Sequence, residues 1–135
     1  MIPKRIFDII VSFAALLFAL PLFVLIAFWI KVDSKGPVFY RGLRIGIHGK
    51  SFRMHKFRTM MVDADKIGGP HKSEDDPSIT HTGRFLRKYK MDELPQLIDV
   101  LKGEMSLVGP RPEVPLYADM FTDEEKAILL VRPGI

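Results

Sequence analysis

Residues 9–30 form an apolar run without a single charged side chain, the longest pattern in the sequence. At about 1.5 Å of rise per residue, a helix of this length measures ~33 Å, close to the ~30 Å hydrocarbon core of a bilayer. Its length therefore predicts a helix that enters a membrane. The run is too long for the apolar core of a secretory signal, and no small-residue cleavage site follows it, so we expect it to be retained.

Positive charges flank this run on both sides. Lys4 and Arg5 precede it, and two lysines follow it. Because Lys and Arg near a membrane helix stay on the cytoplasmic side, both ends are expected there. Pro21 removes a backbone donor and predicts an interruption with a bend. We therefore predict a re-entrant, proline-broken membrane helix over residues 1–33, with Asp8 close enough to Lys4 or Arg5 to pair; a kinked helix that spans the membrane is the alternative.

The remaining residues, 34–135, predict one small domain of the α+β class, mainly helical, with a short β-hairpin. Its strands are expected at 38–40 and 51–58, joined by a glycine-punctuated turn. Short amphipathic helices are expected at 61–67, 83–90, 92–102, 113–120 and 122–131, the last with Thr122 and Glu125 in a capping box. Residues 68–77 predict a polar loop. The chain stops at a turn signal, and we expect it to be part of a longer protein.

Charge and cysteine content narrow the chemistry only slightly. The chain has 20 Lys+Arg against 16 Asp+Glu, a net charge of +4. This excess suits phospholipid headgroups, nucleotide phosphates or nucleic acid, and is too small to choose among them. Cysteine is absent, which excludes disulfides, thiolate metal sites and a thiolate nucleophile. The four histidines show no metal-ligand spacing.

Two adjacent carboxylates, Asp92 and Glu93, stand at the start of the helix predicted over 92–102. In one interpretation Asp92 is simply the N-cap, and both charges favour the helix dipole. In the other, a divalent cation bridges the carboxylates to a phosphate near the helix N-terminus. A carboxylate at such a site can also act as the nucleophile in phosphoryl transfer. Local sequence leaves both interpretations open.

Basic side chains offer further candidate phosphate contacts. Arg111 lies between two prolines, which stiffen the backbone and pre-orient the guanidinium for bidentate phosphate binding; an ordinary turn is the alternative. Lys56 and Arg58 share one face of the second predicted strand, where they either line a pocket or face solvent. A similar basic face comprises Arg84, Arg87 and Lys88.

Several segments, taken together, resemble one family. The most specific are KFRTM at 56–60, DELPQL at 92–97 and MSLVGPRPE at 105–113; others lie at 4–8, 36–39, 76–77, 83–87 and 133–135. They resemble the bacterial sugar transferases, the monotopic phosphoglycosyl transferases that start glycoconjugate assembly on polyprenyl phosphate. The resemblance covers essentially the whole chain, in order.

The resemblance implies an enzyme of the bacterial inner (plasma) membrane, with the re-entrant helix in one leaflet and the catalytic domain, residues 34–135, on the cytoplasmic face. It implies transfer of a phosphosugar from a nucleotide-diphosphate sugar, UDP by family habit, to polyprenyl phosphate, expected to be undecaprenyl phosphate. Mg²⁺ is the implied cofactor. Membrane lipids are expected partners, and nucleic acid is not.

The same resemblance implies roles for individual residues. Asp92 falls on the family's nucleophile and Glu93 on its dyad partner, which assists metal binding. Arg87 matches a phosphate-contacting arginine. The candidate substrate-binding residues are Lys56, Arg58, Arg87, Arg111, Pro112 and Glu113, the candidate metal ligands are Asp92 and Glu93, and the candidate membrane residues are Lys4, Arg5 and Pro21.

The sequence departs from the family pattern at a few positions. Leu20 stands where Ser often precedes the proline, so a hydroxyl that could bond the freed carbonyl is missing. The other departures are Gly42 for Gln, Asp99 for Asn and Glu104 for Asp. Two alternatives to the enzyme remain: a non-catalytic membrane scaffold or inactive fragment of this family, and a membrane-tethered nucleic-acid binder suggested by the pI of about 9.4.

Overall fold

The computed structural model describes residues 2–61, 77–115 and 119–135. The chain divides into two compact units. Unit 1 comprises residues 1–18, 41–55 and 95–135, and unit 2 comprises residues 19–40 and 56–94. The N-terminal helix and both strands of the hairpin contribute residues to each unit. The sequence predicted a different division, into a membrane helix over residues 1–33 and a catalytic domain over residues 34–135. That division concerns function and remains a prediction.

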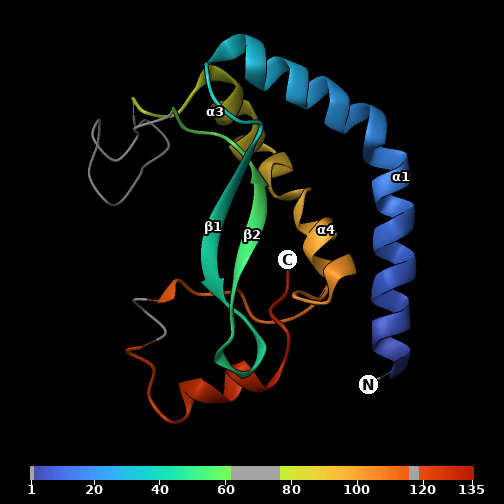
Figure 1. The fold of residues 1–135 in the computed structure, drawn as a ribbon, viewed down its shortest axis with the longest axis vertical. Coiled ribbons are helices and arrows are strands. Elements are labelled where there is room, and N and C mark those ends of the chain that lie inside the picture. The colour runs from blue at the N-terminus through green and yellow to red at the C-terminus, as the bar shows by residue number, and fades with distance from the viewer. Residues whose placement is uncertain (1, 62–76, 116–118) are drawn as a thin grey trace. The chain divides into compact units, whose positions relative to one another are not determined.

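The apolar run forms one helix, α1 (Ile2–Asp33), with Pro21 inside it (Figure 1). The sequence predicted that the helix is interrupted at the proline. This prediction is wrong, because the helix continues through Pro21. Proline costs a helix one hydrogen bond, but its fixed φ near −65° is itself helical. Among the described residues, α1 is long and apolar enough to cross a membrane. Large side chains such as Phe18 (89% exposed) and Phe28 (70%) cover its surface, which indicates membrane association.

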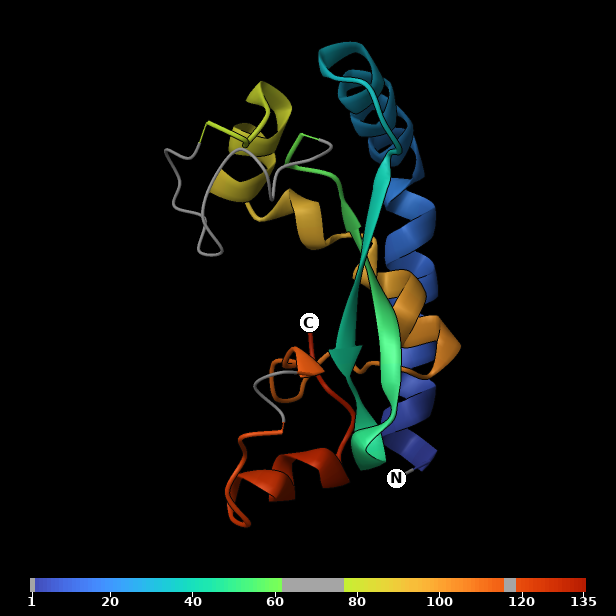
Figure 2. The same cartoon turned by 60° about the vertical axis from the view of Figure 1, so that its left-hand side comes forward.

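The predicted hairpin is confirmed as an antiparallel pair, β1 (Phe39–Ile45) and β2 (Ser51–Phe57), seen side by side in Figures 1 and 2. Strand β1 continues five residues past the prediction, because backbone pairing does not depend on the charged and glycine residues that obscure its alternation. A short 3₁₀ turn, η1 (Ile47–Gly49), joins the strands. His48 and Gly49 adopt positive φ values of 59° and 75°, which allow the chain to reverse.

In unit 2, α3 (His81–Lys88) and the 3₁₀ turn η2 (Met91–Glu93) pack together. Thr80 caps α3, accepting a hydrogen bond from the backbone N–H of Gly83 at 2.9 Å. The helix begins two residues before the predicted start because this cap lies earlier. The core of the unit contains Ile26, Ile30, Phe57 and Leu86, so the C-terminal half of α1 supplies part of it.

In unit 1, α4 (Gln96–Lys102) and the hairpin share a core of Phe52, Met54, Val100 and Met105. The 3₁₀ segment η3 (Glu125–Leu130) lies beside η1 (Figure 2). The predicted capping box is confirmed: the N–H of Thr122 donates to Glu125 Oε2 at 2.8 Å, and the N–H of Glu125 donates to Thr122 Oγ1 at 3.2 Å. The segment that follows is 3₁₀ rather than α-helical.

The Pro-Gly-Ile end packs on the segment that contains the predicted substrate loop. Ser106 donates its backbone N–H to Pro133 O, and Gly134 donates to Pro110 O, both at 2.8 Å. The two backbones pass so closely that a Cβ added to Gly109 would lie 2.4 Å from Arg132 O. Any side chain at Gly109 would therefore separate the two motifs.

The helix predicted over 92–102 is wrong in its first turn. Residues 91–93 form η2, and α4 begins at Gln96 after Pro95. Asp92 therefore does not cap α4; Pro95, which lacks an N–H, occupies the cap position. The predicted helix 61–67 and loop 68–77 lie almost wholly outside the described residues, as does part of the helix predicted over 113–120.

Candidate active site

The carboxylates of Asp92 and Glu93 lie on η2, where the chain reverses after α3. Lys90 makes the reversal in a left-handed conformation, φ 56°, and donates its N–H to Arg87 O at 3.2 Å. This turn buries Asp92, which is 9% exposed, and leaves Glu93 partly exposed. The two adjacent acids therefore occupy different environments.

The surroundings of Asp92 shift its protonation. Burial is the largest influence and raises the pKa of the Asp92 carboxyl above its ordinary value. The positive charges of Lys56 and, to a smaller extent, Arg87 lower this pKa, whereas the negative charge of Glu93 raises it further. Asp92 is thus a desolvated carboxylate with two cations close by, an environment typical of a functional carboxyl group.

Lys56 joins β2 to this turn. Its Nζ lies 3.6 Å from Glu93 Oε1, and both side chains are mostly buried, at 20% and 28% exposure. Lys56 therefore does not simply face solvent, which was one of the two alternatives that the sequence left open. Within the described residues, Lys56 interacts with the carboxylates of Asp92 and Glu93 and with no other carboxylate.

Arg87 and Arg58 have different environments although both were predicted to bind substrate. The Nε of Arg87 donates to Thr59 Oγ1 at 2.9 Å. Arg58 is buried, and its guanidinium donates to Pro37 O at 2.7 Å, Ser34 O at 3.1 Å and, weakly, Met60 O. Burial lowers the pKa of Arg58, an effect partly opposed by Asp33. These bonds fix the chain that follows α1, so Arg58 has a visible structural role.

The remaining predicted substrate-binding residues lie in unit 1. Arg111 is exposed and Pro112 is buried, and Glu113 forms an antiparallel bridge with Ile45, whose N–H donates to Glu113 O at 2.9 Å. The proline-flanked loop is thus tied to the end of β1. This tie, together with the packing of Gly134, gives the loop a fixed backbone.

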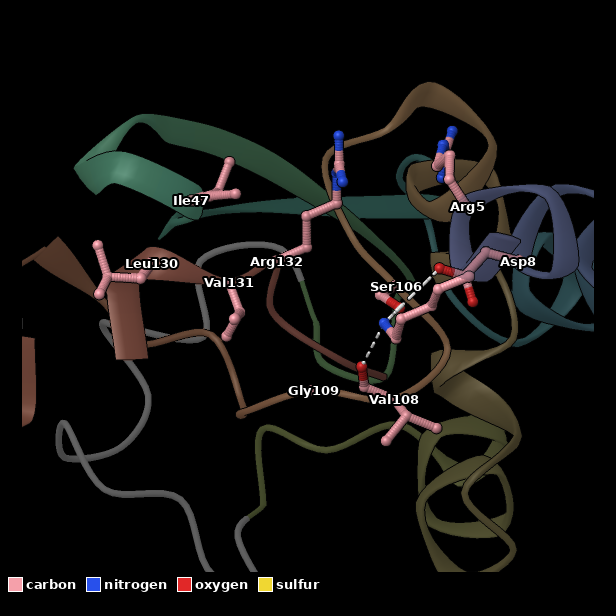
Figure 3. A pocket seen from close by; sticks show the side chains of 10 residues that line it. Arg5, Asp8, Ile47, Ser106, Val108, Gly109, Leu130, Val131 and Arg132 are labelled. Atoms are coloured by element: carbon pink, nitrogen blue, oxygen red, sulfur yellow. Dashed lines mark hydrogen bonds and ion pairs between the residues drawn. The ribbon is translucent and has the colours of Figure 1, made fainter. Parts of the chain in front are cut away.

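Lys4 and Arg5 make contacts that their predicted role in the membrane did not include. Lys4 Nζ lies 3.9 Å from Asp8 Oδ2, which confirms the predicted pair, and Lys4 also donates to Ser106 Oγ. Ser106 in turn donates to Asp8 Oδ2 at 2.7 Å; Figure 3 shows the two side chains facing each other at one wall of a pocket. Arg5 donates to the carbonyls of the last turn of α4, where a cation favours the helix dipole.

Sequence analysis missed Thr59, the partner of Arg87, and the pairing of His55 with Asp99. Thr59 stood within the KFRTM segment, but only its neighbours carry charge. Asp99 was noted only as a departure from the family pattern. In each case the signal in the sequence was a polar side chain within an otherwise charged or apolar motif. Such a side chain forms hydrogen bonds when the fold buries it.

The donor set is suited to one type of metal. Among residues 2–61, 77–115 and 119–135, no group of three or more His, Asp or Glu side chains converges on a metal position. A complete protein cage for Zn²⁺ or Ca²⁺ is therefore not formed by these residues. Mg²⁺ is often held by one or two carboxylates together with water and substrate phosphates, and Asp92 and Glu93 fit that mode.

Comparison with known proteins agrees with this chemistry. A family model described as "Bacterial sugar transferase" matches residues 1–135. The chain is 46% identical over 116 residues to an undecaprenyl-phosphate glucose phosphotransferase of Komagataeibacter xylinus, covering 85% of this chain and 22% of the relative. It is 40% identical over 148 residues to an undecaprenyl-phosphate galactose phosphotransferase of Salmonella typhimurium, covering 98% and 31%.

A shorter relative is the exopolysaccharide production protein ExoY of Sinorhizobium fredii. The chain is 38% identical to it over 149 residues, covering 99% of this chain and 66% of the relative. The chain thus spans about two thirds of the shorter relatives and less than a third of the two longer ones. Because the family model matches from end to end, the chain belongs to the bacterial sugar transferase family.

Proposed function

We propose that the protein transfers a phosphosugar from a nucleotide-diphosphate sugar to a polyprenyl phosphate, the initiating step of bacterial glycoconjugate assembly. The observation that carries the proposal is the burial of Asp92 beside Lys56, Arg87 and Glu93. The relatives named as undecaprenyl-phosphate sugar phosphotransferases support undecaprenyl phosphate as the acceptor. We propose UDP as the nucleotide carrier, following the resemblance.

The proposed chemistry has two displacements at one phosphorus atom. A carboxylate oxygen of Asp92 attacks the sugar-bearing phosphorus of the donor. The phosphoanhydride bond breaks, and the nucleoside monophosphate leaves with the electron pair. An oxygen of polyprenyl phosphate then attacks the same phosphorus, which breaks the bond to Asp92 and restores the carboxylate. The product is a polyprenyl diphosphosugar.

The environment of Asp92 supports a role as nucleophile. A desolvated carboxylate with a raised pKa is more basic than an exposed one, and it reacts once it is ionised. Lys56 and Arg87 keep a useful fraction ionised and neutralise the charge that accumulates when two phosphates meet a carboxylate. Lys56 holds Glu93 through Oε1, and we propose the other carboxylate oxygen as a metal ligand.

We propose Mg²⁺ as the cofactor, held by Asp92, Glu93 and the phosphates of the donor. When bound, the ion supplies charge neutralisation at the diphosphate. Chelation by EDTA should abolish release of nucleoside monophosphate, and excess Mg²⁺ should restore it. Full activity in the presence of excess chelator would remove the metal from the proposal.

We propose that α1 is re-entrant, with both ends at the cytoplasmic face of the inner membrane. The cations near each end and the exposed apolar side chains between them support this arrangement. Cysteines introduced at residues 3 and 35 should both react with a membrane-impermeant thiol reagent only after the cytoplasmic side is opened. Labelling of the two positions from opposite sides would instead establish a helix that spans the bilayer.

The deciding experiment is a screen of nucleotide sugars for release of the nucleoside monophosphate by the chain in detergent or nanodiscs. The wild type with its preferred donor should also show a phosphosugar adduct on Asp92 by mass spectrometry. Asp92→Asn should show neither release nor adduct. An adduct that persists in this variant would assign the nucleophile to another residue, and a chain that reacts with no donor would favour a non-catalytic scaffold.

A further inference from the structure

Arg87 is held by an uncharged, buried side chain that the proposed chemistry does not use. Thr59 is 7% exposed, and its Oγ1 accepts the Nε–H of Arg87 at 2.9 Å. A carboxylate partner would neutralise the guanidinium, whereas a hydroxyl leaves its full charge available. The contact therefore orients Arg87 without neutralising it.

The backbone of Thr59 also holds the opposite end of the helix that carries Arg87. Its carbonyl accepts the N–H of Thr80, the cap residue of α3, at 3.0 Å. At Gly83, in the first turn of α3, an added Cβ would lie only 2.0 Å from Thr59 O. Thr59 thus contacts α3 at its first turn through the main chain and at its last turn through the side chain.

The bond to Nε decides which part of the guanidinium is available. Arg has five N–H donors, of which Nε carries one and the two terminal nitrogens carry four. With Nε bonded to Thr59, the terminal pair remains for a bidentate contact with phosphate. Within the described residues, Arg87 makes no other side-chain hydrogen bond. Its charge is already felt by Asp92, whose pKa it lowers.

We propose that Thr59 is a positioning residue: its hydroxyl fixes the Nε of Arg87 so that the terminal nitrogens are presented to the diphosphate of the donor. This inference rests on the proposed function, because the ligand it names is the substrate of that reaction. It assigns to the KFRTM segment three distinct tasks, with Lys56 at the carboxylates, Arg58 at the end of α1 and Thr59 at Arg87.

The test measures release of nucleoside monophosphate by the full chain as a function of donor concentration. Thr59→Val keeps the shape and removes the hydroxyl, and it should lower kcat/KM for the donor about tenfold, the size of one hydrogen bond. Thr59→Ser should stay within about twofold of wild type. Adding Thr59→Val to Arg87→Lys should cost little more than Arg87→Lys alone, because both remove the same contact.

Thr82→Val is the matched control. Thr82 is a fully buried threonine of α3 whose hydroxyl has no hydrogen-bond partner within the described residues. Its replacement should leave kcat/KM unchanged. If Thr59→Val does not fold, the pair Thr59→Ala and Thr59→Ser isolates the hydroxyl, since these variants differ by that group alone.

The outcomes separate the inference from the function it rests on. If Thr59→Val is as active as the wild type, or if the losses of Thr59→Val and Arg87→Lys add in the double variant, the positioning role is rejected. The proposed function would be unaffected. Equal impairment of Thr59→Ser and Thr59→Ala would reject it also. A wild-type chain that releases no nucleoside monophosphate from any donor would reject both.

Discussion

The backbone N–H and Nδ1 of His55 each lie 2.8 Å from a different oxygen of Asp99. Asp99 is fully buried in α4, and His55 lies on β2, so the pair joins the hairpin to the helix inside unit 1. The two oxygens of the carboxylate make separate contacts: one accepts the backbone N–H of His55, and the other pairs with the imidazole Nδ1. Asp99, one of the departures from the family pattern, therefore has a structural role in unit 1.

Replacing Asp99 should destabilise the fold in a graded way. Asp99→Asn keeps an acceptor for the backbone N–H of His55 but places an amide N–H₂ against Nδ1, which pairs with it only in the Nε2–H tautomer, and we expect a loss of about 1 kcal/mol. Asp99→Ala removes the partner of both His55 groups and should cost about 3 kcal/mol. Thermal unfolding in detergent would measure both, with the fully exposed Asp123→Asn as control. Equal losses for the two Asp99 variants would contradict a role for both oxygens of Asp99.

Asp92→Asn should trade activity for stability. Removal of the nucleophile should lower the rate of donor cleavage by at least ~10³-fold. Because the folded protein raises the pKa of Asp92, folding takes up protons there, so stability falls as pH rises from the ordinary carboxyl pKa through the raised value. At neutral pH the ionised carboxylate thus costs stability, and Asn should raise the unfolding midpoint. An unchanged or lower midpoint would argue against the desolvation of Asp92.

Lys56→Met should move the acid limb of the pH–rate profile. Asp92 attacks as a carboxylate, so activity is lost as pH falls through its pKa. Lys56 lowers that pKa, and its removal should shift the limb to higher pH; Glu93→Gln should shift it to lower pH, because Glu93 raises the pKa. Lys50→Met, an exposed change on the hairpin, is the control. Shifts in the same direction for both site variants would contradict the assignment of the limb to Asp92.

Arg58→Lys should destabilise the protein although it preserves the charge. The planar guanidinium donates to carbonyls in different directions, and an ammonium on a flexible stem cannot reproduce that arrangement. We expect a loss of about 2 kcal/mol for the carbonyls left without a donor. Arg53→Lys, an exposed change on β2 at a side chain with one 3.3 Å bond, should be nearly neutral. A small effect at Arg58 would indicate that substrate contact, rather than chain fixation, is its main role.

The elements that were predicted correctly are determined by residues that lie close together in the sequence. The hairpin follows from two apolar stretches around glycines, and the capping box follows from the spacing of Thr122 and Glu125. The start of α4 was misplaced because Asp92 is a good cap residue, whereas Pro95 marks the true beginning only when its first-turn preference is weighed more heavily. Local chemistry favoured the wrong residue by three positions.

Several contacts that sequence analysis missed join residues far apart in the chain, at the candidate site and elsewhere. Thr59 and Arg87 are 28 positions apart, His55 and Asp99 are 44 apart, and Asp8 and Ser106 are 98 apart. No periodicity encodes such pairs. The sequence did place Lys56, Arg87, Asp92 and Glu93 in one chemical scheme, through the resemblance, but it could not show that Arg58 is committed to backbone carbonyls.

The apolar helix α1 also supplies interior side chains to the rest of the protein. Asp8 and Ser12 are buried in unit 1, and Ile26 and Ile30 are buried in unit 2. Deleting the first 33 residues to obtain a water-soluble fragment would therefore open both interiors at once. The N-terminal helix is therefore an integral part of both interiors, and purification should retain it.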